Sequence, residues 1–118
     1  MNWKLAALVI VALACFAAPA TVGAVRAAAV CADFKQGRLT YHSETLGTSW
    51  TCGSAKRWIV KLIGDRVHIG SKNVPLKNGP RGLHCFATPA SRGGHATSGA
   101  CIQGTLAFPN TGFAWNTA

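Results

Sequence analysis

Two residues of the types needed for acid–base chemistry, His42 and Glu44, stand two positions apart. Residues at that spacing in a β-strand project from the same face. Cleavage of RNA through the ribose 2′-hydroxyl uses such a base and acid, with a cation to hold the phosphate. Other residues that could take part are His68, His84, Arg57 and Lys61. A histidine and a glutamate at this spacing also arise by chance, and no pancreatic-type or guanyl-specific motif accompanies them. We therefore expect no enzyme and keep a secreted ribonuclease as an alternative.

Cysteines are the second reactive set. Cys15 falls in the N-terminal apolar segment, which leaves an even number in the rest of the chain. These are Cys31, Cys52, Cys85 and Cys101. An even number in a small exported chain predicts two disulfides. Three pairings are possible and the spacing does not choose among them; we favour Cys31–Cys85 with Cys52–Cys101.

The sequence does not indicate a metal site or a cofactor. It contains no C-x-x-C pair, and the adjacent His84 and Cys85 would point to opposite faces of a strand. If all four cysteines outside the N-terminal segment are paired, none is free to act as a nucleophile.

The first 24 residues have the pattern of a secretory signal peptide. Lys4 precedes an apolar run over residues 5–18, and small residues lead to a cleavage position after Ala24. A membrane span needs about 20 apolar residues, and Pro19 interrupts the run first. We predict that residues 1–24 are removed and that residues 25–118 form one secreted, extracellular domain.

The chain is strongly basic. Twelve Lys and Arg residues oppose three acidic ones, and removal of Lys4 with the signal peptide lowers the formal charge from +9 to +8. Such a protein is attracted to polyanions and acidic surfaces. The expected partner is a host or competitor protein, or an anionic surface. Nucleic acid is not expected, because strand alternation turns most aromatic residues toward the core.

Short apolar segments are separated by Gly, Pro, Asn and Ser every 6 to 12 residues, a rhythm typical of all-β domains. The prediction is a small disulfide-stabilised β-sandwich or barrel of six to seven short antiparallel strands, present as a monomer. No helix is expected after residue 30. The candidate strands are residues 37–43, 49–52, 56–63, 66–70, 83–87, 100–108 and 113–115.

The segment from residue 56 to residue 70 predicts a β-hairpin with a two-residue turn at Gly64-Asp65. Strand alternation then gives this hairpin an apolar side that is expected in the core. The residues of this side are Trp58, Val60, Leu62, Val67 and Ile69. The opposite side carries Arg57, Lys61, Arg66 and His68, which we predict as a binding surface. Like charges on neighbouring strands repel each other; the simpler alternative is a solvated face that discourages aggregation.

Residues 57–61 and 66–71 resemble the central hairpin of an avirulence protein of the MAX effectors, a family of small secreted fungal proteins. The resemblance implies two packed three-stranded sheets joined by a disulfide. It also implies a non-enzymatic role in which a host protein is bound, sometimes by pairing at a sheet edge. We therefore expect a binding protein of the effector or virulence type; the alternatives are a cationic antimicrobial or toxin-like protein and the ribonuclease.

Overall fold

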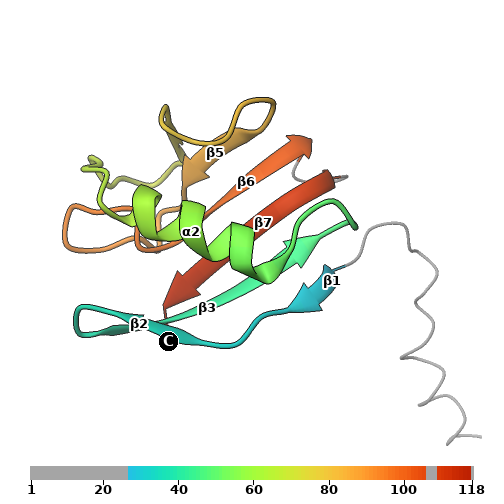
Figure 1. The fold of residues 1–118 in the computed structure, drawn as a ribbon. Coiled ribbons are helices and arrows are strands. Elements are labelled where there is room, and N and C mark those ends of the chain that lie inside the picture. The colour runs from blue at the N-terminus through green and yellow to red at the C-terminus, as the bar shows by residue number, and fades with distance from the viewer. Residues whose placement is uncertain (1–26, 106–108, 118) are drawn as a thin grey trace, which may run out of the picture.

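A computed structural model describes residues 27–105 and 109–117 of the chain (Figure 1). The predicted signal peptide and the end of the predicted strand 100–108 lie outside these residues. The structure is mostly β, with one described helix, α2 (Cys52–Ile63). The strands are β1 (Ala27–Val30), β2 (Phe34–Gln36), β3 (Leu39–Leu46), β4 (Val74–Leu76), β5 (His84–Ala87), β6 (Gly99–Gly104) and β7 (Pro109–Thr117).

The seven strands form one antiparallel sheet in the order β1-β3-β7-β6-β5-β4. β2 pairs with the first half of β3 and β1 with its second half, so these two strands share one edge. The predicted fold class, six to seven antiparallel strands with two disulfides, is confirmed. A single sheet provides these strands, and α2 covers one of its faces in place of a second sheet (Figure 1).

The predicted hairpin over residues 56–70 is wrong. Cys52–Ile63 is helical, which also removes the predicted strand at 49–52. After the helix, residues 66–70 make only one isolated bridge, between Arg66 and His95. Alternation at Trp58, Val60 and Leu62 suggested a strand, but only Leu62 of the three is buried.

The helix is specified by a different spacing. Ala55, Ile59 and Leu62 lie three and four positions apart and are fully buried, which places them on one helical stripe. Thr51 caps the N-terminus, because its side-chain oxygen accepts a hydrogen bond from the Ser54 backbone N–H at 3.1 Å. These local features and the buried stripe together outweigh the strand preference of the β-branched residues.

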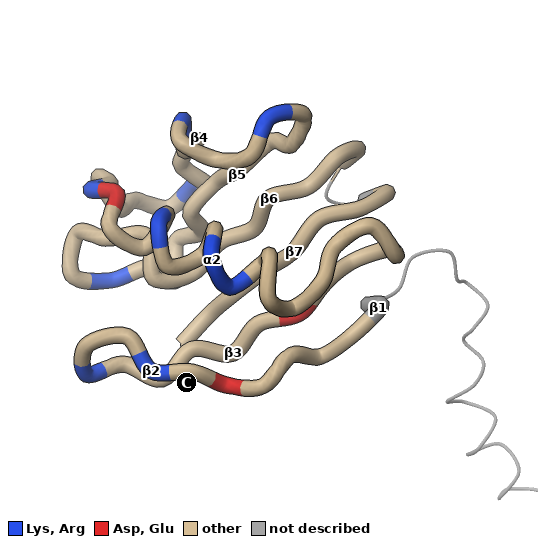
Figure 2. Tube along the Cα trace, viewed as in Figure 1, with Lys and Arg blue, Asp and Glu red and all other residues tan. Residues whose placement is uncertain are grey.

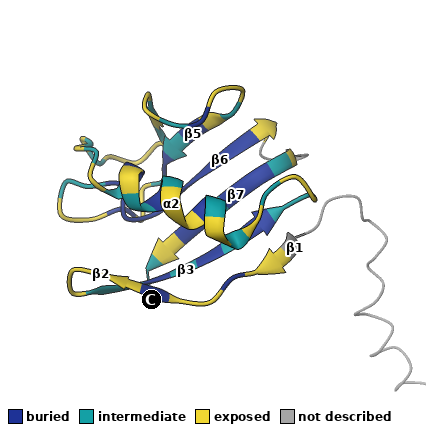
Figure 3. Cartoon of the chain, viewed as in Figure 1, coloured by how far each residue is buried: buried dark blue, intermediate teal, exposed yellow. Residues whose placement is uncertain are grey.

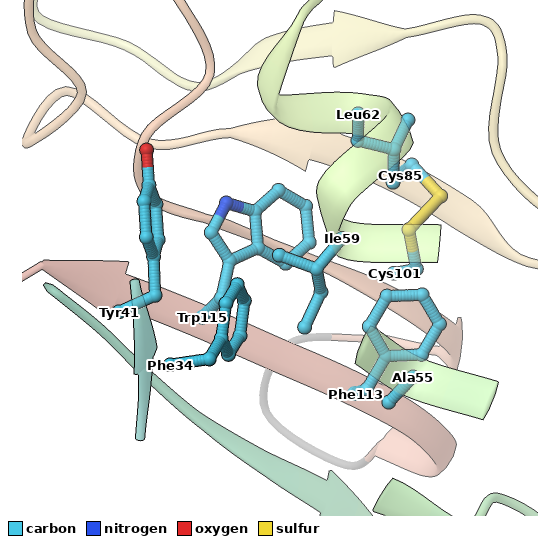
Figure 4. Packing of buried hydrophobic residues seen from close by; sticks show 9 residues of the cluster. All are labelled: Phe34, Tyr41, Ala55, Ile59, Leu62, Cys85, Cys101, Phe113 and Trp115. Atoms are coloured by element: carbon cyan, nitrogen blue, oxygen red, sulfur yellow. A yellow bond between two sulfur atoms is a disulfide. The ribbon is translucent and has the colours of Figure 1, made fainter. Parts of the chain in front are cut away.

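The core lies between α2 and the sheet (Figures 3 and 4). Ile59 and Leu62 point from α2 toward Phe113, Trp115 and the sulfur atoms of Cys85 and Cys101. At the other end of the core, Phe34 stacks on Tyr41 with ring centroids 5.5 Å apart. The burial of α2 against the sheet fixes which side of the helix faces outward.

The prediction of two disulfides is confirmed, but the favoured pairing is wrong: the bonds are Cys31–Cys52 and Cys85–Cys101. Cys85 and Cys101 are directly opposite in the β5–β6 ladder, with Cα atoms 3.9 Å apart. Cys31, between β1 and β2, is bonded to the first residue of α2. This second bond attaches the start of the helix to the edge of the sheet. Two disulfides in a small domain are typical of oxidising compartments.

Within the described part of the chain, no helix has the length and apolar character needed to cross a bilayer.

Candidate functional site

Three exposed basic side chains on the outward side of α2 form the main candidate site. Lys56, Arg57 and Lys61 are exposed, whereas the opposite stripe of the helix is buried. At 3.6 residues per turn, the three positions fall within one outward arc that also contains the half-buried Val60. We call these three residues the cationic face; Figure 2 shows the basic positions on α2.

The charges of the cationic face are not compensated locally. α2 contains no acidic residue, and among the described residues the only ion pair, between His42 and Asp33, involves none of the three cations. Arg57 and Lys61 stand at the i,i+4 spacing, where like charges destabilise a helix by a few tenths of a kcal/mol. Lys56, near the N-terminus, also opposes the helix dipole. The helix would be more stable with an acidic residue in this face.

Aromatic and polar contacts hold the three cations. The Lys61 ammonium lies 4.8 Å from the centroid of the Trp58 ring, and the Lys56 ammonium lies 5.2 Å from that of Phe34. The Arg57 guanidinium donates a hydrogen bond of 3.3 Å to the Ser54 hydroxyl. A ring face engages the positive charge without providing a carboxylate, so the ammonium groups keep their charge available for a partner.

The structure brings together only part of the predicted binding surface. Arg57 and Lys61 lie one turn apart on α2, but Arg66 follows the helix and its guanidinium lies 3.5 Å from Nε2 of His95. His68 is exposed in a segment without strand pairing, so the predicted hairpin that would have placed it on the same side as Lys61 does not exist. Sequence reasoning missed Lys56, which a helical projection from Ala55, Ile59 and Leu62 would have found.

His42 and Glu44 lie on the same face of β3, as predicted, and this face of the sheet is the one that α2 leaves open. The Nδ1 atom of His42 is 2.7 Å from a carboxylate oxygen of Asp33. A shallow hollow of about 110 Å³ runs beside His42 and Glu44 and reaches Asn116 on β7. Lys35 lies across from Thr40 on β3, at the same edge of the sheet.

A cleft of about 480 Å³ lies at the other end of the sheet. Its lining includes Pro75, Leu83, His84, Phe86 and Ile102. His84, one of the three histidines considered for acid–base chemistry, has mainly apolar neighbours in this cleft. Within residues 27–105 and 109–117, no three His, Cys, Asp or Glu side chains are grouped so that they could hold a metal ion.

No protein-family model, curated protein or solved structure matches this chain. The residues that carry the resemblance to the MAX effectors form α2 and the segment after it, where the resemblance implied a hairpin. Membership of that family stays a prediction. The candidate functions are therefore weighed on the chemistry of the described residues.

Proposed function

We propose that this is a secreted protein of the effector type that acts by binding, and that an acidic surface of a host or competitor protein docks on the cationic face. The observation that carries the proposal is the unpaired charge of Lys56, Arg57 and Lys61, exposed together on a helix without a single acidic residue. Charges arranged in this way raise association rates with acidic partners and favour them over basic ones.

A protein partner is better supported than a lipid bilayer. A helix that lies in a membrane interface needs a free apolar side, but Ala55, Ile59 and Leu62 are fully buried against the sheet. The cationic antimicrobial or toxin alternative would therefore rest on charge alone. Release of dye from anionic vesicles at protein concentrations that saturate the acidic partner would favour that alternative instead.

Charge reversal tests the role of the cationic face. The double variant Arg57→Glu/Lys61→Glu is titrated into poly-L-glutamate, a simple acidic polypeptide, by calorimetry at low and physiological salt. We expect affinity to fall at least about tenfold, because attraction becomes repulsion at the contact. The matched control is Lys35→Glu/Arg38→Glu, which changes the net charge equally on the β2–β3 hairpin. It should lower affinity by less than about threefold through long-range charge alone.

Equal losses in the two double variants would contradict the proposal, because the net charge would then account for binding. Circular dichroism of both variants checks that α2 is intact. Arg66→Glu, beyond the end of the helix, should have an effect closer to that of the control pair.

A ribonuclease is the second candidate, and one contact favours it. Asp33 can orient the His42 ring through the 2.7 Å contact at Nδ1, which leaves Nε2 as the atom able to exchange a proton with a substrate. Glu44 on the same face would be the second acid–base group. Purified protein incubated with RNA should then cleave it, and His42→Ala should not. Absence of cleavage by the unmodified protein would remove this candidate and leave binding.

A further inference from the structure

A small cleft opens where the first turn of α2 meets the sheet. Its volume is about 190 Å³, and its lining includes Asp33, Phe34, Ser43, Cys52, Gly53 and Lys56. We propose that this cleft binds an oxyanion of the phosphate type. The cleft shares Lys56 with the cationic face, but neither Arg57 nor Lys61 lines it, so the two proposals can be tested separately.

The start of α2 supplies backbone donors to the cleft. The Thr51 side chain already accepts the Ser54 N–H, and the Ala55 N–H bonds to the Thr51 carbonyl oxygen at 2.9 Å. The N–H groups of Cys52 and Gly53 have no acceptor within the described part of the chain. Gly53 is exposed and lines the cleft, and a Cβ atom built on it would meet nothing within 4 Å. Free N–H groups and the helix dipole favour an anion there.

The Ser43 hydroxyl is the independent observation that points to a ligand. Ser43 is only 7% exposed, on the side of β3 that faces α2, and it lines the cleft. This hydroxyl makes no hydrogen bond to another described residue, and it is not among the fully buried unpaired oxygens, so it is open to the cleft. A hydroxyl that opens into a cleft can donate a hydrogen bond to a molecule bound there. An oxyanion seated at the first turn of α2 would accept its hydrogen bond.

Lys56 supplies the positive charge. Its ammonium is held at 5.2 Å from the centroid of the Phe34 ring, and both residues line the cleft. The ring contact leaves the N–H donors of Lys56 available for a phosphate oxygen. The negative charge of Asp33 opposes an anion, but its carboxylate is engaged by His42 at 2.7 Å. We therefore expect Asp33→Asn to bind the anion more tightly.

The test is a titration of the ¹⁵N-labelled, disulfide-bonded protein with inorganic phosphate, with sodium chloride adjusted to keep the ionic strength constant. The amide signals of Cys52 and Gly53 should shift and reach saturation. Lys56→Gln should weaken binding at least about tenfold, and Ser43→Ala about threefold, in line with loss of a charged and a neutral donor. Ser43→Ala removes an unpaired hydroxyl, so it should fold; thermal unfolding checks this.

Lys61→Gln is the matched control, because it removes the same charge from the same helix outside the cleft. Its phosphate affinity should stay within about twofold of the original protein. Shifts that never saturate, or equal losses in Lys56→Gln and Lys61→Gln, would overturn the proposal in favour of general charge screening. Unchanged binding by a folded Ser43→Ala would overturn the role given to the hydroxyl. The variant Arg57→Glu/Lys61→Glu should lose poly-L-glutamate binding and still show saturable phosphate binding, which would show that the cleft is a site distinct from the rest of the cationic face.

Discussion

Lys56 of α2 reaches the ring of Phe34 on β2, with its ammonium 5.2 Å from the ring centroid. Phe34 in turn stacks on Tyr41 of β3, so one cation of the cationic face is positioned by the edge of the sheet. Cys31–Cys52 attaches the start of the helix to the same edge. The placement of this charge therefore depends on tertiary structure as well as on the helix.

The contribution of Tyr41 to the free energy of unfolding should depend on pH. Burial raises the pKa of its hydroxyl above the usual value of tyrosine. The unfolded chain then loses this proton first, so the Tyr41 contribution is complete below pH about 10 and declines as the pH rises through the folded-state pKa. The difference in free energy of unfolding between the original protein and Tyr41→Phe, measured in urea, should decline above that pH. The lysines titrate in both proteins and cancel in the difference. If the free energy of unfolding of the two proteins changes in parallel up to about pH 11, Tyr41 is not the source of the pH dependence.

The buried hydroxyl of Thr45 indicates a position where a substitution should stabilise the protein. The residue is 1% exposed and its hydroxyl has no hydrogen-bond partner. Thr45→Val removes this buried unpaired group, so we expect the free energy of unfolding to rise by about 1 kcal/mol. Thr88→Val is the control, because the Thr88 hydroxyl donates to that of Ser98 at 2.8 Å; it should be destabilising by about 1 kcal/mol. Destabilisation of similar size in both variants would show that the Thr45 hydroxyl has a partner.

The two disulfides can be checked by peptide mapping of the unreduced protein. Linked peptides should contain Cys31 with Cys52 and Cys85 with Cys101. Replacing Cys31 and Cys52 together by serine should lower the free energy of unfolding by about 3 kcal/mol, from the entropy of a 21-residue loop. A linked peptide that joins Cys31 to Cys85 would contradict both the attachment of α2 to the sheet edge and the pairing of β5 with β6.

The sequence allowed β3, β5, β6 and β7 to be predicted, because strands in a one-sided sheet leave a clear pattern, whereas the short strands β1, β2 and β4 were missed. The predicted strand at 83–87 closely matches β5 (His84–Ala87), where buried Cys85 and Ala87 alternate with less buried residues. The strand predicted at 37–43 overlaps β3 (Leu39–Leu46), and His42 and Glu44 share a face as expected. Turn residues and alternation were sufficient for these elements.

The helix was missed because two periods fit the same short apolar segment. Residues 58, 60 and 62 alternate like a strand, whereas Ala55, Ile59 and Leu62 follow a helical stripe; packing on the sheet selects the second. Because residues 56–63 are helical, Arg57 and Lys61 still lie together, whereas Arg66 and His68 do not share their surface. Disulfide pairing depends on which strands become neighbours, as the β5–β6 register of Cys85 and Cys101 shows. Spacing along the chain does not contain that information.

Nuclear magnetic resonance can locate a bound acidic polypeptide on the surface of the protein directly. Poly-L-glutamate is added to the ¹⁵N-labelled, disulfide-bonded protein, and shifts of the backbone amide signals are mapped along the chain. If the cationic face binds the partner, the largest shifts fall on Lys56, Arg57, Val60 and Lys61 of α2, and they disappear in Arg57→Glu/Lys61→Glu. Shifts that concentrate on the β2–β3 hairpin, or that spread over all basic residues alike, would contradict it.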